Sequence, residues 1–234
     1  MTDRAPAPPV DALDEGLLKY ADVTTVHLIR HAQQDYPRGG RPIGEVVDPP
    51  LSPIGERQVE RVGERFAAVR LDAVYSSHLV RAFRTGDAVG RAHGLVPTVD
   101  KDLREFDIYR DLPPDRSPEE SLGPEAVARA RRAMAADLRW DSYPASETSA
   151  EFRVRVDAAI GRIVAAHPGG HIAVACHGGV INAFLAHHLG MRADMFFRAA
   201  HTSVTTVRVH GHRVVPESFN DRSHLSGDER LLTY

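Results

Sequence analysis

The stretch TVHLIRHAQ, Thr25–Gln33, joins a short apolar run to a cation and an imidazole. An apolar run of this length, followed by a loop rich in Gly and Pro, is typical of a buried strand in a parallel sheet. Arg30 and His31 then stand at the carboxyl end of that strand. Because open α/β sheets bind ligands beyond the carboxyl ends of their strands, this stretch predicts a site for an anion.

The rest of the chain alternates short apolar runs with helical patterns, which favours one α/β domain with a mostly parallel sheet. LDAVYSS at residues 71–77 and HIAVAC at residues 171–176 are typical of buried strands, and a shorter strand is predicted at residues 96–99. Two runs on either side of His-Gly-His, at residues 203–209 and 213–217, predict an antiparallel hairpin at the sheet edge.

Capping residues mark the starts of three helices. Ser52 precedes a proline and a helical pattern, which is typical of a helix N-terminus. Ser76 or Ser77 is expected to cap the helix that follows the second strand. Thr148 and Glu151 have the spacing of a capping box, which predicts a helix from this point.

Three irregular segments flank these elements. Residues 1–22 are predicted to form an N-terminal tail, partly disordered or draped over the domain at residues 23–234. Proline-rich loops are predicted at residues 34–50 and at residues 109–124. Loops longer than about 12–15 residues in a compact domain are usually functional or disordered, so each of these segments is a candidate cover for the site.

Composition and charge argue against several classes of protein. The formal net charge of −3 gives no basic surface for nucleic acid. No run approaches the roughly 18 apolar residues of a membrane-spanning helix, and residues 1–22 lack the pattern of a signal peptide. The single cysteine, Cys176, excludes an internal disulfide and is compatible with a reducing compartment. We therefore expect a cytoplasmic protein.

Two predicted strand ends carry a histidine. His31 follows the first strand, and His177 follows the strand at residues 171–176. Arg81 lies one turn into the helix after the second strand, and Gly178 begins another helix with its backbone N–H open to a ligand. Arginine forks pair two phosphate oxygens at once, so this set predicts a pocket for a doubly charged tetrahedral anion.

Such a pocket suits phosphoryl transfer to an imidazole. Neighbouring arginines lower the pKa of a histidine and would keep His31 neutral and nucleophilic. An alcohol leaving group needs a proton, and Glu105 in the segment LREFD is the first candidate acid, with Asp107 as the second.

The motifs together resemble the histidine phosphatase superfamily, which includes the cofactor-dependent phosphoglycerate mutases. RHA resembles its R-H-G motif, LSPIGERQ resembles L-[ST]-x-x-G-x-x-Q, and YSSHLVRAFRT is similar to S-S-x-L-x-R-[AT]-x-x-T. LREFD is similar to the segment that carries the proton donor, SETSAEFRVRV to G-E-S-x-x-[DE]-x-x-x-R-V, and ACHGGVI to the second-histidine motif. The matches follow the family's order over roughly residues 23–225.

This resemblance implies a three-layer α/β/α sandwich and a role for each matched residue. His31 would be phosphorylated, while Arg30, Arg81 and His177 would bind the phosphoryl group. Glu105 would protonate the leaving oxygen and later activate water. The family needs no metal, so the resemblance implies no metal site and no cofactor, and a small phosphorylated molecule as the partner.

Several positions depart from the family pattern near the substrate. Gln33 is retained and is a candidate substrate contact, but Pro37 and His201 stand where Asn is common. The segment after LREFD lacks the usual aromatic-Glu-Gly tail, and the segment by which mutases position a phosphosugar acid is absent. These departures favour a phosphomonoesterase. A mutase and a non-catalytic phosphate-ligand binder remain as alternatives, and the sequence leaves open whether the chain forms a homodimer.

Overall fold

The computed structural model describes residues 22–36 and 40–234. Apart from Asp22, the tail predicted over residues 1–22 therefore lies outside the described residues. No helix within the described ranges is long and apolar enough to cross a bilayer.

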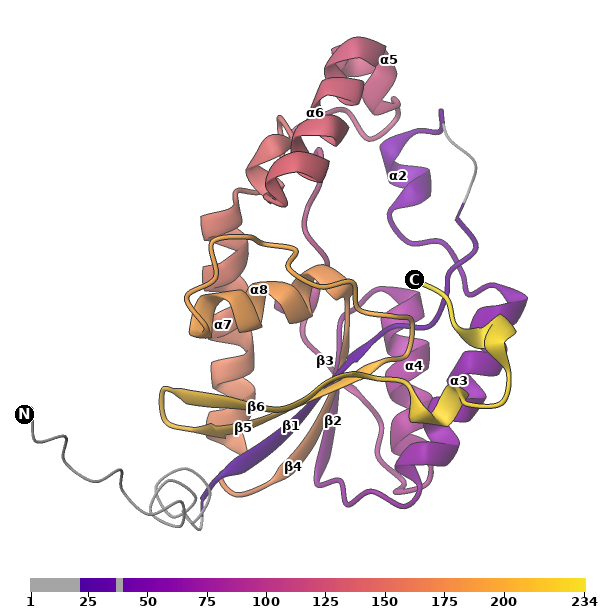
Figure 1. The fold of residues 1–234 in the computed structure, drawn as a ribbon. Helices are drawn as coiled ribbons and strands as arrows, with labels where there is room; N and C mark the ends of the chain where they lie inside the picture. Colours follow the sequence, from indigo (N-terminus) through magenta and orange to yellow (C-terminus); the bar gives the residue numbers. More distant parts are fainter. Residues whose placement is uncertain (1–21, 37–39) are drawn as a thin grey trace, which may run out of the picture.

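A six-stranded mixed sheet forms the centre of the molecule, with the strand order β3-β2-β4-β1-β5-β6 (Figure 1). The first four strands in this order are parallel, whereas β5 and β6 form an antiparallel hairpin at one edge. The predicted α/β fold with an antiparallel edge hairpin is thus confirmed. The strand bounds are Thr24–Arg30 (β1), Ala73–Ser76 (β2), Thr98–Val99 (β3), His171–Cys176 (β4), Val204–His210 (β5) and Arg213–Asp221 (β6).

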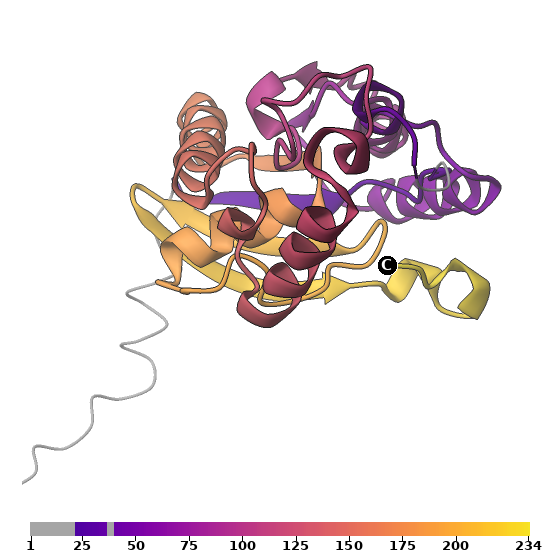
Figure 2. The ribbon, with the colours of Figure 1, turned by 90° about the horizontal axis from the view of Figure 1, so that it is seen from above.

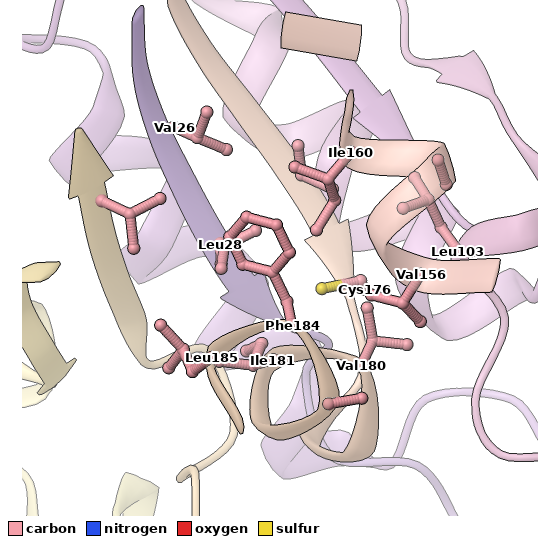
Figure 3. Packing of buried hydrophobic residues seen from close by; sticks show 14 of the residues in the cluster. Val26, Leu28, Leu103, Val156, Ile160, Cys176, Val180, Ile181, Phe184 and Leu185 are labelled. Carbon is pink, nitrogen blue, oxygen red and sulfur yellow. The ribbon is translucent and has the colours of Figure 1, made fainter. Parts of the chain in front are cut away.

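Helices cover both faces of the sheet, which gives three layers. Helices α3 (Pro53–Phe66) and α4 (Val80–Arg91) lie on one face, and α7 (Ser149–Ala166) and α8 (Gly178–His188) lie on the other (Figure 1). Alternation along β1 explains how one strand serves both layers, because successive side chains of a strand point to opposite faces. Leu28 packs among α7 and α8 (Figure 3), whereas its neighbour Ile29 packs against α3.

A group of short helices lies beyond the carboxyl ends of the parallel strands. This group comprises α2 (Ile43–Val46), α5 (Pro118–Leu122) and α6 (Pro124–Asp137), and Figures 1 and 2 show α5 and α6 over the same end of the molecule as α8. The backbone N–H of Ile43 donates to Arg116 O at 3.0 Å, and that of Gly44 donates to Pro114 O at 2.9 Å. The loops at 34–50 and 109–124 are therefore tied to each other. Within the described residues, four 3-10 helices complete the fold, at Lys101–Leu103 (η1), Trp140–Ser142 (η2), Ser223–Leu225 (η3) and Glu229–Leu231 (η4).

Local capping accounts for two of the three helix starts predicted from the sequence. The Ser52 hydroxyl accepts the Gly55 N–H at the start of α3, and Thr148 and Glu151 form the expected capping box at the start of α7. The prediction for α4 is wrong. Neither Ser76 nor Ser77 caps this helix, because the chain extends as far as Leu79 before the helix begins at Val80.

The cap of α4 comes from a distant part of the chain. Both carboxylate oxygens of Asp48 accept the Val80 N–H, at 2.9 and 3.0 Å. A carboxylate is favourable at a helix N-terminus because the backbone N–H groups and the helix dipole are positive there. Asp48 thereby fixes the loop at 34–50 against the helix that carries Arg81.

A buried ion pair holds the segment that carries Glu105. Glu147 and Arg155 make a bidentate pair, with Nε–Oε1 at 2.7 Å and Nη2–Oε2 at 2.6 Å, and both side chains are almost fully buried. Arg155 Nη1 also donates to Asp102 O at 2.7 Å and to Arg104 O at 3.1 Å. Glu147 also contacts the other end of this segment, because its Oε2 accepts the backbone N–H of Asp107 at 3.2 Å. This pair therefore clamps residues 102–107 from both ends.

Replacing Glu147 with Gln should destabilise the protein strongly. The substitution leaves the buried Arg155 charge without its counter-ion, and breaking a buried pair in this way costs about 3–5 kcal/mol. We expect the free energy of unfolding, measured by urea denaturation, to fall by that amount. The control is Glu125→Gln, which removes the same charge from an exposed pair with Arg129 and should have no measurable effect. Equal effects of the two substitutions would show that the buried pair does not hold this segment.

Candidate active site

The pairing of β1 with β4 brings the two predicted histidines together. In this parallel ladder Arg30 is opposite Cys176, so His31 and His177 both follow directly at the carboxyl ends of adjacent strands. The backbone N–H of His31 donates to the backbone oxygen of Cys176 at 2.9 Å. The imidazole centroids of His31 and His177 lie 5.0 Å apart. The prediction that both histidines face one crevice agrees with this geometry.

A hydrogen bond determines which nitrogen of His31 is free to react. Nδ1 lies 2.8 Å from the Ala32 carbonyl oxygen, which can only accept a hydrogen bond. Nδ1 therefore carries the proton, and Nε2 keeps its lone pair. Burial lowers the pKa of His31 well below its usual range, and His177, Arg81 and Arg30 lower it further. The ring is thus a neutral imidazole with a nucleophilic Nε2.

His177 is the N-cap residue of α8 and is completely buried. Neither of its ring nitrogens has a hydrogen-bond partner among the described residues. Burial, followed by the charges of Arg81 and Arg30, holds its pKa well below the usual range. A buried imidazole without a partner normally indicates a ligand contact, because buried polar groups in native proteins are otherwise satisfied.

Arg30 and Arg81 bring two cations to the same place, of which Arg81 is buried and Arg30 is partly buried. Arg30 Nη1 donates to Ala199 O at 2.5 Å, and Arg81 Nη1 donates to Val47 O at 2.9 Å. Arg81 forms an ion pair with Asp48 at 3.4 Å, and the charge of Glu105 also acts on it. Burial lowers the pKa of Arg30 to about 10 and also lowers that of Arg81. The Nε of each arginine is buried without a partner among the described residues, so both guanidinium groups have donors available to an anion.

Two backbone donors hold Glu105 against the first turn of α8, which begins directly after His177. Its Oε1 accepts the Phe106 N–H at 3.0 Å, and its Oε2 accepts the Gly179 N–H at 3.1 Å. A side chain at position 179 would displace the Glu105 carboxylate, because a Cβ there would clash with Glu105 Oε1 and press on Trp140. The second candidate acid, Asp107, instead lies 3.5 Å from Arg104. The geometry therefore favours Glu105 over Asp107.

A cavity of about 210 Å³ adjoins this cluster, although His31, Arg81 and His177 are not among its lining residues. Arg30, Glu105 and Gly178 line it, together with Trp140, Arg198 and Tyr234. Gln33 is not part of this lining. Its side-chain oxygen accepts the Ser52 hydroxyl at 2.7 Å, and its role as a substrate contact stays a prediction. No cluster of three or more His, Cys, Asp and Glu residues that could hold a metal occurs among the residues that the structure describes.

Sequence reasoning did not identify two residues that complete this cluster. Asp48 binds Arg81 and caps its helix, and His201 lies beside Arg30, with its ring centroid 5.6 Å from that of His31. No local pattern marks Asp48. In the sequence, His201 stood out only as a departure from the family pattern. Its contact with Arg30 could not be predicted, because the two residues are far apart in the sequence.

Known proteins with similar sequences and structures include phosphatases and mutases. A Salmonella choleraesuis protein named "Probable phosphoglycerate mutase GpmB" is 29% identical over 170 residues, which is 72% of this chain and 76% of that protein. The solved structure of YhfR from Bacillus stearothermophilus is 25% identical, with a TM-score of 0.69 over 87% of this chain and 100% of the other. A mycobacterial glucosyl-3-phosphoglycerate phosphatase, solved in complex with VO3, is 25% identical, with a TM-score of 0.68 over 85% of this chain and 99% of the other.

The family match covers most of the chain. Residues 26–222 match the histidine phosphatase superfamily (branch 1), a range that includes both arginines, both histidines and Glu105. The match extends from the first strand to the end of the edge hairpin, so it includes the whole sheet described above. The chain therefore belongs to the histidine phosphatase superfamily, branch 1.

Proposed function

We propose that this protein is a metal-independent phosphomonoesterase that acts on a small phosphorylated metabolite through a phosphohistidine at His31. One observation carries the proposal. Buried nitrogen atoms of Arg30, Arg81 and His177 lack hydrogen-bond partners among the described residues and surround a neutral imidazole. A dianionic phosphoryl group supplies acceptors for the guanidinium N–H groups and for the one N–H of the neutral His177 ring, and its charge offsets that of the two guanidinium groups.

In the first step, His31 Nε2 attacks phosphorus, and an N–P bond forms as the bond from phosphorus to the alcohol oxygen breaks. Glu105, in its acid form, gives its proton to that oxygen, so the product leaves as a neutral alcohol. Arg30 and Arg81 donate to the equatorial oxygens, on which charge is spread in the transition state.

In the second step, Glu105 is a carboxylate and takes a proton from water as the water oxygen attacks phosphorus. The N–P bond breaks, inorganic phosphate leaves, and His31 returns to the neutral imidazole. The proton that Glu105 gave to the alcohol is thereby replaced, and the enzyme is ready for another cycle. The same two residues serve both steps with reversed roles: His31 is first the nucleophile and then the leaving group, and Glu105 is first the acid and then the base.

The similarity to a mycobacterial phosphatase supports hydrolysis, whereas the similarity to GpmB favours a mutase as the second candidate. The two differ in where the phosphoryl group goes. A phosphatase releases it to water, and a mutase returns it to another hydroxyl of the substrate. Release of inorganic phosphate across a panel of phosphorylated metabolites therefore decides between them.

Replacing His31 with Ala should abolish turnover, with a loss of at least about 10³-fold in kcat, because no other group can form the N–P bond. Brief incubation of the wild type with a ³²P-labelled substrate should give a phosphoprotein that is labile to acid and stable to alkali. His31→Ala should not be labelled, whereas His212→Ala, in the hairpin turn, should be labelled normally. An acid-stable adduct would exclude the phosphohistidine.

Replacing Glu105 with Gln should slow the hydrolysis of substrates with poor leaving groups more than that of substrates with good ones. An alkyl phosphate needs the proton that Glu105 supplies, so its kcat/KM should fall by about 10²–10⁴-fold. For an aryl phosphate with a stable phenolate leaving group, such as p-nitrophenyl phosphate, kcat/KM should fall much less. The comparison is Asp107→Asn, for which both substrates should be affected equally and weakly. If Glu105→Gln slows the two substrates by the same factor, Glu105 is not the general acid.

A further inference from the structure

A turn between α8 and β5 places His201 against Arg30. Thr202 has a φ of 56°, a left-handed conformation that β-branched residues rarely adopt. The Thr202 N–H donates to Arg30 O at 3.0 Å, and the Arg30 N–H donates to Ser203 O at 3.2 Å. The turn is therefore clamped onto the end of β1, and strain of this kind persists only where the surrounding structure demands it.

The contact with Arg30 determines the tautomer of His201. Arg30 Nη2 lies 3.0 Å from His201 Nε2, and a guanidinium can only donate. Nε2 must accept, so the neutral ring carries its proton on Nδ1. That Nδ1–H lies 2.9 Å from Thr233 Oγ1, which is placed to accept it. A hydrogen-bond path thus runs from Arg30 through His201 to Thr233.

A second path reaches Thr233 from the other side and is compatible with this arrangement. The backbone N–H of Gln33 donates to Gln58 Oε1 at 2.8 Å, which identifies that atom as the amide oxygen. Gln58 Nε2 then donates to Leu231 O at 2.7 Å and to Thr233 Oγ1 at 2.8 Å. The two lone pairs of the Thr233 hydroxyl oxygen can accept from both Gln58 and His201.

We propose that His201 and Thr233 are positioning residues, which hold the Arg30 guanidinium in the orientation that binds the phosphoryl group. This inference rests on the proposed role of Arg30 in phosphate binding. His201 Nε2 accepts an N–H of Arg30 Nη2, and the carbonyl oxygen of Ala199 accepts an N–H of Arg30 Nη1. The remaining donors, including Nε, are then presented to the phosphoryl oxygens. Arginine recognises phosphate through a rigid planar fork, so a small rotation of the fork loses more than one hydrogen bond.

The electrostatics around His201 fit this role. Burial and the neighbouring Arg30 lower its pKa to about 3, so the ring stays neutral and can accept from the guanidinium. The segment that carries Thr233 lies against α3, which also carries Gln58 (Figure 1). The neighbouring Tyr234 lines the cavity itself. Residues 231–234 therefore include both a residue that lines the cavity, Tyr234, and a residue that contacts His201, Thr233.

The test replaces Thr233 with Val, which keeps the shape of the side chain and removes the acceptor. The probe is orthovanadate or inorganic phosphate, and calorimetry measures its binding, so the result does not depend on turnover. We expect binding to weaken by about 3–10-fold, the range for loss of one neutral hydrogen bond. Thr233→Ser keeps the hydroxyl and should bind as the wild type does. The matched control is Thr24→Val, at the opposite end of β1, which also loses a buried hydroxyl.

A spectroscopic measurement reads the tautomer directly. Long-range ¹H–¹⁵N spectra should show His201 protonated on Nδ1 and unprotonated on Nε2 in the wild type. In Thr233→Val we expect a mixture of tautomers, because the ring loses its Thr233 anchor and moves away from the Arg30 donor that fixes the tautomer. A purely structural role for Thr233 would lower the melting temperature of both Thr233→Val and Thr24→Val without changing the tautomer or the binding of phosphate. That result would overturn the inference.

The outcomes also separate this inference from the proposed function. If the wild type binds phosphate but releases none from any substrate, the phosphatase proposal fails, and the binding series still decides the role of Thr233. If the wild type is an active phosphatase and Thr233→Val binds phosphate normally, the positioning role alone fails. If the wild type binds neither phosphate nor vanadate, both proposals fail.

Discussion

Positive charge buried at the carboxyl end of the sheet is the constraint on which the rest of this structure depends. Arg81 is buried and Arg30 is partly buried, and burial lowers the pKa of both, that of Arg30 to about 10. A buried charge is costly unless it is paired, and Asp48 offers the only carboxylate ion pair to either arginine among the described residues, at 3.4 Å from Arg81. Two histidines in the same cluster are held neutral by the same charges and by burial. A site of this kind is adapted to receive an anion.

Holding such groups together requires support from far along the chain. Asp48 ties the loop at 34–50 to the helix of Arg81, and the Glu147–Arg155 pair clamps the segment that carries Glu105. Thr233 supports His201, which in turn contacts Arg30. The supports made by Asp48 and by the Glu147–Arg155 pair involve charged groups, and such bonds are the stronger class in proteins, whereas the Thr233–His201 bond joins two neutral groups. The site is therefore rigid, although loops form most of its rim.

The features predicted well from the sequence were those with a local physical cause. Apolar runs identified β1 and β4, and the caps at Ser52 and Thr148 marked α3 and α7 correctly. The start of α4 was missed because its cap is the carboxylate of Asp48, 32 residues away. The choice of Glu105 over Asp107 agrees with the structure, but its physical reason, the N–H of Gly179 as a partner, depends on how α8 meets the loop after β3.

By itself, the sequence determined the fold class, the order of the strands along the chain and the residues that stand at the strand ends, because periodicity and turn residues act within a few positions. The tertiary structure alone decided the spatial order β3-β2-β4-β1-β5-β6, which sets His31 beside His177. It also decided the protonated nitrogen of His31 and the tautomer of His201, since each depends on the acceptor or donor that the fold places 2.8–3.0 Å away. Those partners arise from packing between distant segments, and no local pattern in TVHLIRHAQ contains them.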